Sequence, residues 1–249
     1  MAVYDIAGVR IDSATVSGST PLPFLSINHK GYTRDGAAAN SLNAFKASFA
    51  HGFRAIETDV RYSSDNVPVL SHDETYSGLT IAQTEYATLK AAGITSLDEL
   101  IEYCKETGLI PYLELKVNSN TLNDYAIDVV AKYGMMDHVV WISAYSGAVS
   151  HIVSVYDKAN VRVQGSASTT PSGLEYLKTG KNIVGTYLST GAAGTGVNSS
   201  VSLPLAEAGY VVGGFTYSSQ SSNMILDNKR GVTEFTTDYV KAEDLIVPT

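Results

Sequence analysis

Short apolar runs and longer amphipathic stretches alternate along most of the chain. The short runs are rich in β-branched and aromatic residues, which is typical of strands, and the apolar residues between them recur at helical spacing. Eight runs are predicted as strands: 25–29, 54–60, 110–117, 138–144, 161–167, 182–188, 210–217 and 232–238. Strands that alternate with helices form parallel sheets, so eight of them predict an α/β fold, a (β/α)8 TIM barrel.

One strand-like segment, residues 67–73, does not fit this alternation. Only six residues, Arg61 to Asn66, separate it from the predicted strand at 54–60. A parallel crossover needs a dozen or more residues, so the segment must turn back antiparallel after SSDN. We expect this antiparallel β return to lie over the C-terminal mouth of the barrel and to bring His72 beside the strand ends.

Residues 1–24 are predicted to form a separate N-terminal extension. They alternate weakly and close with the prolines of STPLP. This pattern predicts either a hairpin that plugs one end of the barrel or an attachment arm. Residues 25–249 are then expected to form a single barrel domain, because such a barrel takes about 250 residues. The Gly/Ser-rich segment 191–200 is predicted to be a loop at the rim of the site.

The composition limits the classes of partner. The formal net charge is −8, and Lys and Arg are not clustered. Such a chain is a poor match for nucleic acid or an anionic membrane, so the expected partner is a small molecule. No apolar run approaches the ~20 residues of a membrane-spanning helix, and the N-terminus lacks a signal-peptide pattern. A cytoplasmic and an extracellular location both stay open. The single cysteine, Cys104, excludes an internal disulfide and a multi-cysteine zinc site.

Ionisable side chains share one face of two predicted strands. Residues two apart on a strand point the same way, so AIETDV places Glu57 and Asp59 together, and YLELKV places Tyr112, Glu114 and Lys116 together. The opposite faces are apolar and suit a shell of helices. The two strands are expected to be neighbours, so the three carboxylates should converge inside the barrel or at its mouth.

Three carboxylates in a partly desolvated space repel one another. At about 4 Å and an effective dielectric constant of ~20, each pair costs on the order of 4 kcal/mol. Either the pKa values of the acids rise or a cation lies among them. An all-oxygen set of ligands favours one divalent cation, Mg²⁺ or Ca²⁺, over zinc. The alternative is a polar plug in which the acids pair with Lys116, Lys30 or Arg54.

Two histidines lie at the ends of strand-like runs. His29 precedes Lys30 in INHKGY, and His72 closes VPVLSH. Two imidazoles beside a cation and a lysine can act as acid and base around an anion, which is the chemistry of phosphodiester cleavage. The other histidines, at positions 51, 138 and 151, are interpreted as ordinary helix or strand residues.

Several of these segments together resemble a known family. They are HKGY, NSLNAF, GFRAIETDV, VPVLSHDET and LELK, followed later by WISAY and GVTEFTTD. Their order and spacing are similar to the H-R-G, E-N-T, E-x-D-V, H-D and E-L-K pattern of the glycerophosphodiester phosphodiesterases. Each motif alone is weak, and the set in one order is specific.

The resemblance implies an activity and a role for each matching position. The activity is hydrolysis of glycerophosphodiesters to an alcohol and glycerol 3-phosphate, in which a cyclic phosphate forms and water then opens it. The implied roles are a cation held by Glu57, Asp59 and Glu114, general acid and base by His29 and His72, and phosphate contacts by Lys116 and, at the family's arginine position, Lys30.

Three positions depart from the family's pattern and bear on the substrate. Lys30 replaces arginine, Ala39 replaces the glutamate before Asn40, and Phe215 replaces tryptophan. Phe215 and Tyr112 are candidates for the wall of the pocket. Two alternatives stay open. The same site could act on lysophospholipids or teichoic acid-like wall polymers, or the barrel could be a non-catalytic binding module attached through residues 1–24.

Overall fold

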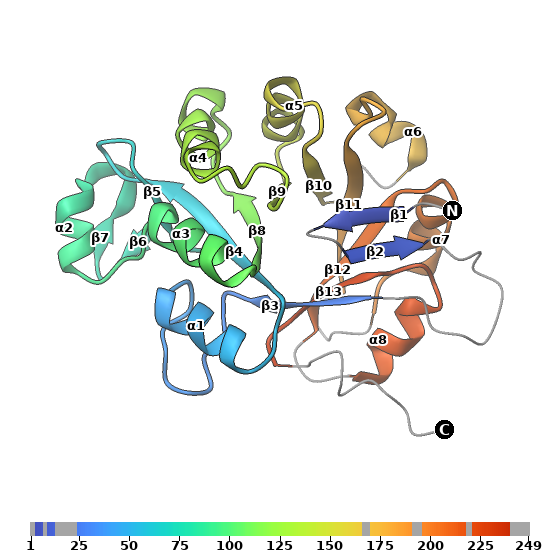
Figure 1. The fold of residues 1–249 in the computed structure, drawn as a ribbon, viewed down its shortest axis with the longest axis horizontal. Coiled ribbons are helices and arrows are strands. Elements are labelled where there is room, and N and C mark those ends of the chain that lie inside the picture. The colour runs from blue at the N-terminus through green and yellow to red at the C-terminus, as the bar shows by residue number, and fades with distance from the viewer. Residues whose placement is uncertain are drawn as a thin grey trace.

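The computed structural model of the protein describes residues 3–6, 9–12, 24–165, 170–190, 196–217 and 221–239. Parallel strands form a closed barrel in the order β3-β13-β12-β11-β10-β9-β8-β4, and the pairing of β3 with β4 closes it (Figure 1). The strands are β3 Leu25–His29, β4 Ala55–Tyr62, β8 Ile110–Leu115, β9 Val140–Ser143, β10 Asn160–Gln164, β11 Ile183–Ser189, β12 Val211–Tyr217 and β13 Glu234–Thr237. The predicted TIM barrel is confirmed.

Helices surround the strands, as Figure 1 shows for α3, α4, α5 and α6. The helices are α1 Leu42–Ala50, α2 Tyr86–Ala91, α3 Leu97–Thr107, α4 Asn120–Lys132, α5 Ser146–Val155, α6 Pro171–Leu174, α7 Ser199–Glu207 and α8 Ser221–Asn228, with 3₁₀ turns at Ile81–Gln83 and Glu175–Leu177. No described helix has the length and apolar character that crossing a membrane takes.

The antiparallel return after β4 is also confirmed. Strand β5, Pro68–Leu70, pairs antiparallel with β4, with Val60 opposite Leu70. The pairing continues beyond β5, since the Ser71 backbone N–H donates to the Asp59 carbonyl at 3.0 Å. Two short strands follow, β6 Thr75–Tyr76 and β7 Leu79–Thr80, which pair with each other. Because β5 and Ser71 pair with the end of β4, the chain returns to the mouth of the barrel just before His72.

At the N-terminus, β1 Val3–Ile6 and β2 Val9–Asp12 pair antiparallel. This pairing is one of the two arrangements expected of residues 1–24. Their division from a barrel domain, and their use as a plug or an arm, stay predictions. The predicted rim loop at 191–200 and the end of the predicted strand at 161–167 lie partly outside the described residues.

The barrel interior carries a buried ion pair below the mouth. Arg162 and Glu234 are fully buried and lie 2.7 Å apart. The hydroxyl group of Tyr112 donates to Glu234 Oε1 at 2.9 Å, and Tyr112 is itself fully buried. A buried charge needs such partners, because desolvation otherwise disfavours it strongly. Tyr112 thus belongs to the packed interior and not to the wall of an open pocket.

Candidate active site

Three carboxylates meet where β4 and β8 run side by side. The two strands pair in parallel with Asp59 opposite Glu114, and Glu57 lies two residues before Asp59 on the same face. One oxygen from each of Glu57, Asp59 and Glu114 lies within 4.8 Å of the others. We call these residues the acid trio. The apolar neighbours Ile56 and Val60 pack in the core between the strands and the surrounding helices, which we call the outer core. The expected alternation of faces and the convergence of the acids are therefore confirmed.

Burial makes the negative charge of the acid trio costly. Glu57 and Asp59 are only 4% and 1% exposed. Desolvation by burial, with repulsion from Asp59 and Glu114, raises the pKa of Glu57 well above its usual value, and nearby lysines only partly oppose this. Among the described residues, Glu57 Oε2 and Asp59 Oδ1 have no hydrogen-bond partner. Buried carboxylate oxygens that converge without donors fit a hard divalent cation.

Lys116 pairs with part of the acid trio. Its Nζ lies 2.8 Å from Glu114 Oε1 and 3.2 Å from Asp59 Oδ1, the second without the alignment of a hydrogen bond. Burial acts to lower the pKa of Lys116, but Glu114 and Asp59 outweigh it and raise that pKa. This arrangement resembles the polar plug in part. One lysine cannot neutralise three acids, however, and Glu57 keeps an oxygen without a donor.

His29 stands between the acid trio and a fourth acid. It pairs with Glu57 across β3 and β4, and its Nε2 lies 4.0 Å from Glu57 Oε2. Its Nδ1 lies 2.9 Å from Asp238 Oδ1, directly after β13. The side chain is 26% exposed, so the ring can be reached from the mouth. One nitrogen is held by Asp238, and the other faces the acid trio.

The turn after His29 requires glycine. Gly31 has φ +84°, and a Cβ added there would lie 2.6 Å from Ala44 Cβ and 2.9 Å from the Ala44 carbonyl carbon. Those contacts are too close for any side chain, so the HKG turn can pack on α1 only with glycine at this position. The preceding Lys30 has φ +56°, and its N–H donates to the Glu57 carbonyl at 3.0 Å. The backbone thereby holds His29 and Lys30 at the edge of the acid trio.

His72 is more exposed than His29. Its side chain is 53% exposed, and its Nδ1 lies 2.8 Å from Asp73 Oδ1. Arg61 donates to the His72 carbonyl from Nε and Nη2, at 3.0 and 2.8 Å. The hydrogen bond with His72 lowers the pKa of Asp73, and Lys30 adds to this lowering. The structure thus brings His72 to the rim, with its ring turned to Asp73.

A family model matches this part of the chain. The model for the glycerophosphoryl diester phosphodiesterase family matches residues 29–182, which include the acid trio and both histidines. This chain belongs to that family. The motifs between residues 29 and 182 that suggested the resemblance therefore reflect membership.

Solved structures of family members share the fold. A glycerophosphodiester phosphodiesterase from Parabacteroides distasonis superposes with a TM-score of 0.73 at 21% identity, covering 86% of this chain and 92% of that one. A phosphodiesterase from Oleispira antarctica, solved with the product sn-glycerol-3-phosphate, gives 0.70 at 21% identity, covering 86% and 93%. Likeness at this identity shows the fold alone.

A curated relative is similar over a short segment. The "Probable glycerophosphodiester phosphodiesterase 2" of Mycobacterium tuberculosis is 43% identical over 49 residues. The match spans 20% of this chain and 19% of that relative. It thus supports membership of the glycerophosphoryl diester phosphodiesterase family and says nothing about the rest of the relative.

Asn40 is a residue of the site to which the sequence motifs gave no role. Its Nδ2 donates to Asp59 Oδ2 at 2.9 Å, and its Oδ1 accepts from the Thr58 hydroxyl at 2.7 Å. Asn40 is buried and has φ +56°, a conformation that asparagine tolerates better than most residues. It therefore fixes the orientation of one ligand of the acid trio. The signal was its place in NSLNAF, directly after Ala39, where this chain departs from the family.

Replacing Asn40 with alanine should destabilise the protein by about 1–3 kcal/mol, since a buried carboxylate oxygen and a buried hydroxyl would each lose a partner. Urea unfolding, read from the midpoint and the slope, measures this change. Asn120→Ala is the matched control, because Asn120 is exposed at the start of α4 and should change stability by less than about 0.5 kcal/mol. Equal stability of the two variants would contradict the role of Asn40.

Phe215 lies near the mouth of the barrel, toward the C-terminal end of β12. It is half-buried on β12 and stacks on Tyr187, with ring centroids 5.9 Å apart and planes 12° apart. Tyr187 is in turn fixed by a hydrogen bond between its hydroxyl and that of Thr236. Because Tyr187 is fixed, the ring of Phe215 that stacks on it presents an ordered apolar surface.

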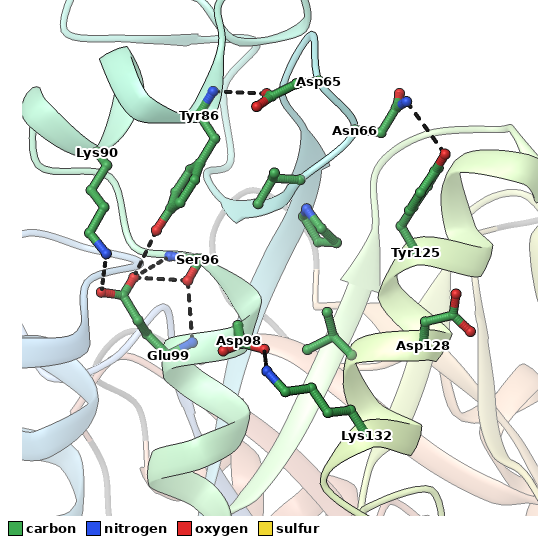
Figure 2. Close-up of a pocket in the computed structure, with 13 residues that line it drawn as sticks. Asp65, Asn66, Tyr86, Lys90, Ser96, Asp98, Glu99, Tyr125, Asp128 and Lys132 are labelled. Carbon is green, nitrogen blue, oxygen red and sulfur yellow. Dashed lines mark hydrogen bonds and ion pairs between the residues drawn. The ribbon is translucent and has the colours of Figure 1, made fainter.

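A separate groove of about 610 Å³ lies outside the barrel, between α2, α3 and α4 (Figure 2). Its polar side chains pair with one another, as in Lys132 with Asp98 and Lys90 with Glu99. Neither the acid trio nor His29 or His72 lines it. The groove is therefore not the candidate active site.

Proposed function

We propose that the protein hydrolyses glycerophosphodiesters to an alcohol and glycerol 3-phosphate. The observation that carries this proposal is the acid trio, with an oxygen of each member within 4.8 Å of the others and His29 Nε2 4.0 Å from Glu57. Both features fall within the residues that match the family model. The Oleispira antarctica phosphodiesterase, which shares the fold, was solved with sn-glycerol-3-phosphate, and this supports the same class of product here.

In this proposal Glu57, Asp59 and Glu114 hold one divalent cation, Mg²⁺ or Ca²⁺. When bound, such a cation polarises a phosphoryl oxygen and neutralises negative charge. Lys116, which already spans Glu114 and Asp59, would turn its ammonium group toward the phosphate. Lys30, at the rim, would add a second positive charge. A lysine gives a point charge without the two-pronged geometry of arginine, so the phosphate is held less rigidly.

His29 and His72 would transfer the protons. A glycerol hydroxyl next to the phosphoester attacks phosphorus and gives its proton to one imidazole. The other imidazole protonates the departing alcohol oxygen, which leaves a cyclic phosphate. Water then opens the ring with the same two groups in exchanged roles. The contact of His29 Nδ1 with Asp238 and that of His72 Nδ1 with Asp73 each leave Nε2 for this work.

The test is release of glycerol 3-phosphate by the cation-loaded protein. Glycerophosphocholine, glycerophosphoethanolamine and glycerophosphoglycerol would be compared with lysophosphatidylcholine and a glycerol phosphate oligomer, with and without chelator. We expect release from the small diesters, abolished by chelator. Preference for the lipid or the oligomer would assign the same site to that substrate class. No release from any of them, at any tested cation, would favour the binding module, for which attachment through residues 1–24 stays a prediction.

A further inference from the structure

Four inward-facing side chains share one level of the barrel: His29 of β3, Glu114 of β8, Gln164 of β10 and Phe215 of β12. In a (β/α)8 barrel a level advances by one residue at each step from strand to strand, and alternate strands supply its side chains. When the observed strand pairs are followed from His29 with this advance, the path passes Glu114, Gln164 and Phe215 in turn. It closes on His29 when the pairing of Gly214 with Phe235 is extended by one residue into the irregular part of β12. Gln164 therefore lies at the height of the proposed reaction.

Gln164 faces His29 from the opposite wall. Strand β10 lies four strands from β3 in either direction around the barrel. The Oε1 atom of Gln164 is buried and has no hydrogen-bond partner in the described part of the chain. A buried polar atom without a partner destabilises a fold, so one in a native site needs an explanation.

The other buried atoms without partners do not share this position. Those of Glu57 and Asp59 belong to the acid trio. Ser26 Oγ lies three residues before His29 on β3, and so on the opposite face of that strand. Asn160 Nδ2 lies four residues before Gln164 on β10, near the bottom of the barrel. Trp141 Nε1 lies in the outer core. Gln164 alone among these combines an unpaired buried amide oxygen with the level of His29 and the side of the mouth away from the acid trio.

We propose that Gln164 binds a hydroxyl group of the glycerol part of the substrate, and so selects phosphodiesters in which the carbon chain that stays on the phosphate carries free hydroxyls. This rests on the proposed function, in which the phosphate is held at the acid trio. A glycerol unit bound there extends across the mouth toward β10 and β12. The amide oxygen accepts a hydrogen bond from a hydroxyl, and the ring of Phe215 packs on the carbon chain.

A hydrogen bond from a substrate hydroxyl to Gln164 predicts that the site distinguishes ligands with that hydroxyl from ligands without it. A site that hydrogen-bonds a substrate hydroxyl rejects an analogue without it, because a buried polar group is then left unpaired. Glycerol 3-phosphate and 1-propyl phosphate have the same carbon chain and differ by two hydroxyls. Their affinities for the cation-loaded protein therefore isolate the contribution of the hydroxyls from that of the phosphate.

The test is calorimetric titration of the wild type and Gln164→Met with both phosphates. Methionine keeps the length of the side chain and removes its polar end. We expect glycerol 3-phosphate to bind the variant about tenfold more weakly, with 1-propyl phosphate unchanged and the Tm no lower than that of the wild type. Gln83→Met, at an exposed glutamine, should change none of these values. Equal weakening of both ligands, or of neither, would overturn the assignment of Gln164.

Turnover of glycerophosphocholine by the wild type, measured in parallel, separates this inference from the proposed function. If the wild type turns over the diester and Gln164→Met does not discriminate between the two phosphates, only the role of Gln164 is wrong. If the wild type neither turns over the diester nor binds glycerol 3-phosphate, both the proposed function and the role of Gln164 are wrong.

Discussion

Replacing Glu57 with glutamine should abolish release of glycerol 3-phosphate and also remove the rise in Tm that a divalent cation gives the wild type. The pKa of Glu57 is raised well above its usual value by burial and by repulsion from Asp59 and Glu114. An amide in its place carries no charge and gives a cation a weaker ligand. Activity and cation binding should therefore be lost together.

The cation effect is large enough to measure. A ligand that binds only the folded state stabilises it by about 2.7 kcal/mol at a concentration of 100 times its Kd. For a chain of this length, 1 kcal/mol shifts Tm by roughly 2–4 °C. We therefore expect a rise of roughly 5–10 °C for the wild type and almost none for Glu57→Gln. Glu102→Gln, at an exposed acid of α3, is the matched control and should keep both the activity and the rise.

Without the cation, the same variant should respond differently to pH. Because the pKa of Glu57 is raised in the folded state, the unfolded chain loses this proton first. The cation-free wild type should thus lose stability as pH rises above about 4.5, the ordinary value, until Glu57 itself ionises. Glu57→Gln lacks this loss and should equal or exceed the cation-free wild type at neutral pH. In the cation experiment, a rise in the Tm of Glu57→Gln as large as that of the wild type would contradict the assignment of Glu57 as a ligand of the cation.

The acid trio could be predicted from sequence because it rests on local rules. The alternation of faces in AIETDV and YLELKV follows from the period of two in a strand, and their adjacency follows from the order of strands in a barrel. The return of β5 was predictable from the six residues that precede the segment at 67–73, too few for a parallel crossover.

The remaining contacts depend on how the barrel closes, which no local pattern specifies. Asp238 lies 209 residues from His29 and reaches it only because β13 pairs with β3. Tyr112 shares a strand face with Glu114, yet it lies one level deeper in the barrel. There its hydroxyl group donates a hydrogen bond to Glu234. Strand alternation predicts the face of a side chain, whereas the tilt and shear of the whole barrel decide its level.

Replacing His29 or His72 with alanine should each lower kcat for glycerophosphocholine about 100-fold or more, since each removes one partner of the proton transfer. The cation-induced rise in Tm should remain, because neither imidazole is a proposed ligand of the cation. Steady-state kinetics and thermal unfolding with and without cation measure the two effects. His138→Ala, at an exposed histidine away from the mouth, is the control and should match the wild type.

Asp238→Asn refines the same prediction. The Asp238 carboxylate lies 2.9 Å from His29 Nδ1 and can hold the ring so that Nε2 faces the acid trio. Asparagine can still accept a hydrogen bond but does not stabilise a positive imidazolium, so kcat should fall by less than in His29→Ala while KM stays near the wild-type value. Such a split would not follow from a general loss of structure, which lowers the active fraction and Tm together. Wild-type turnover by either histidine variant would show that the protons move through other groups.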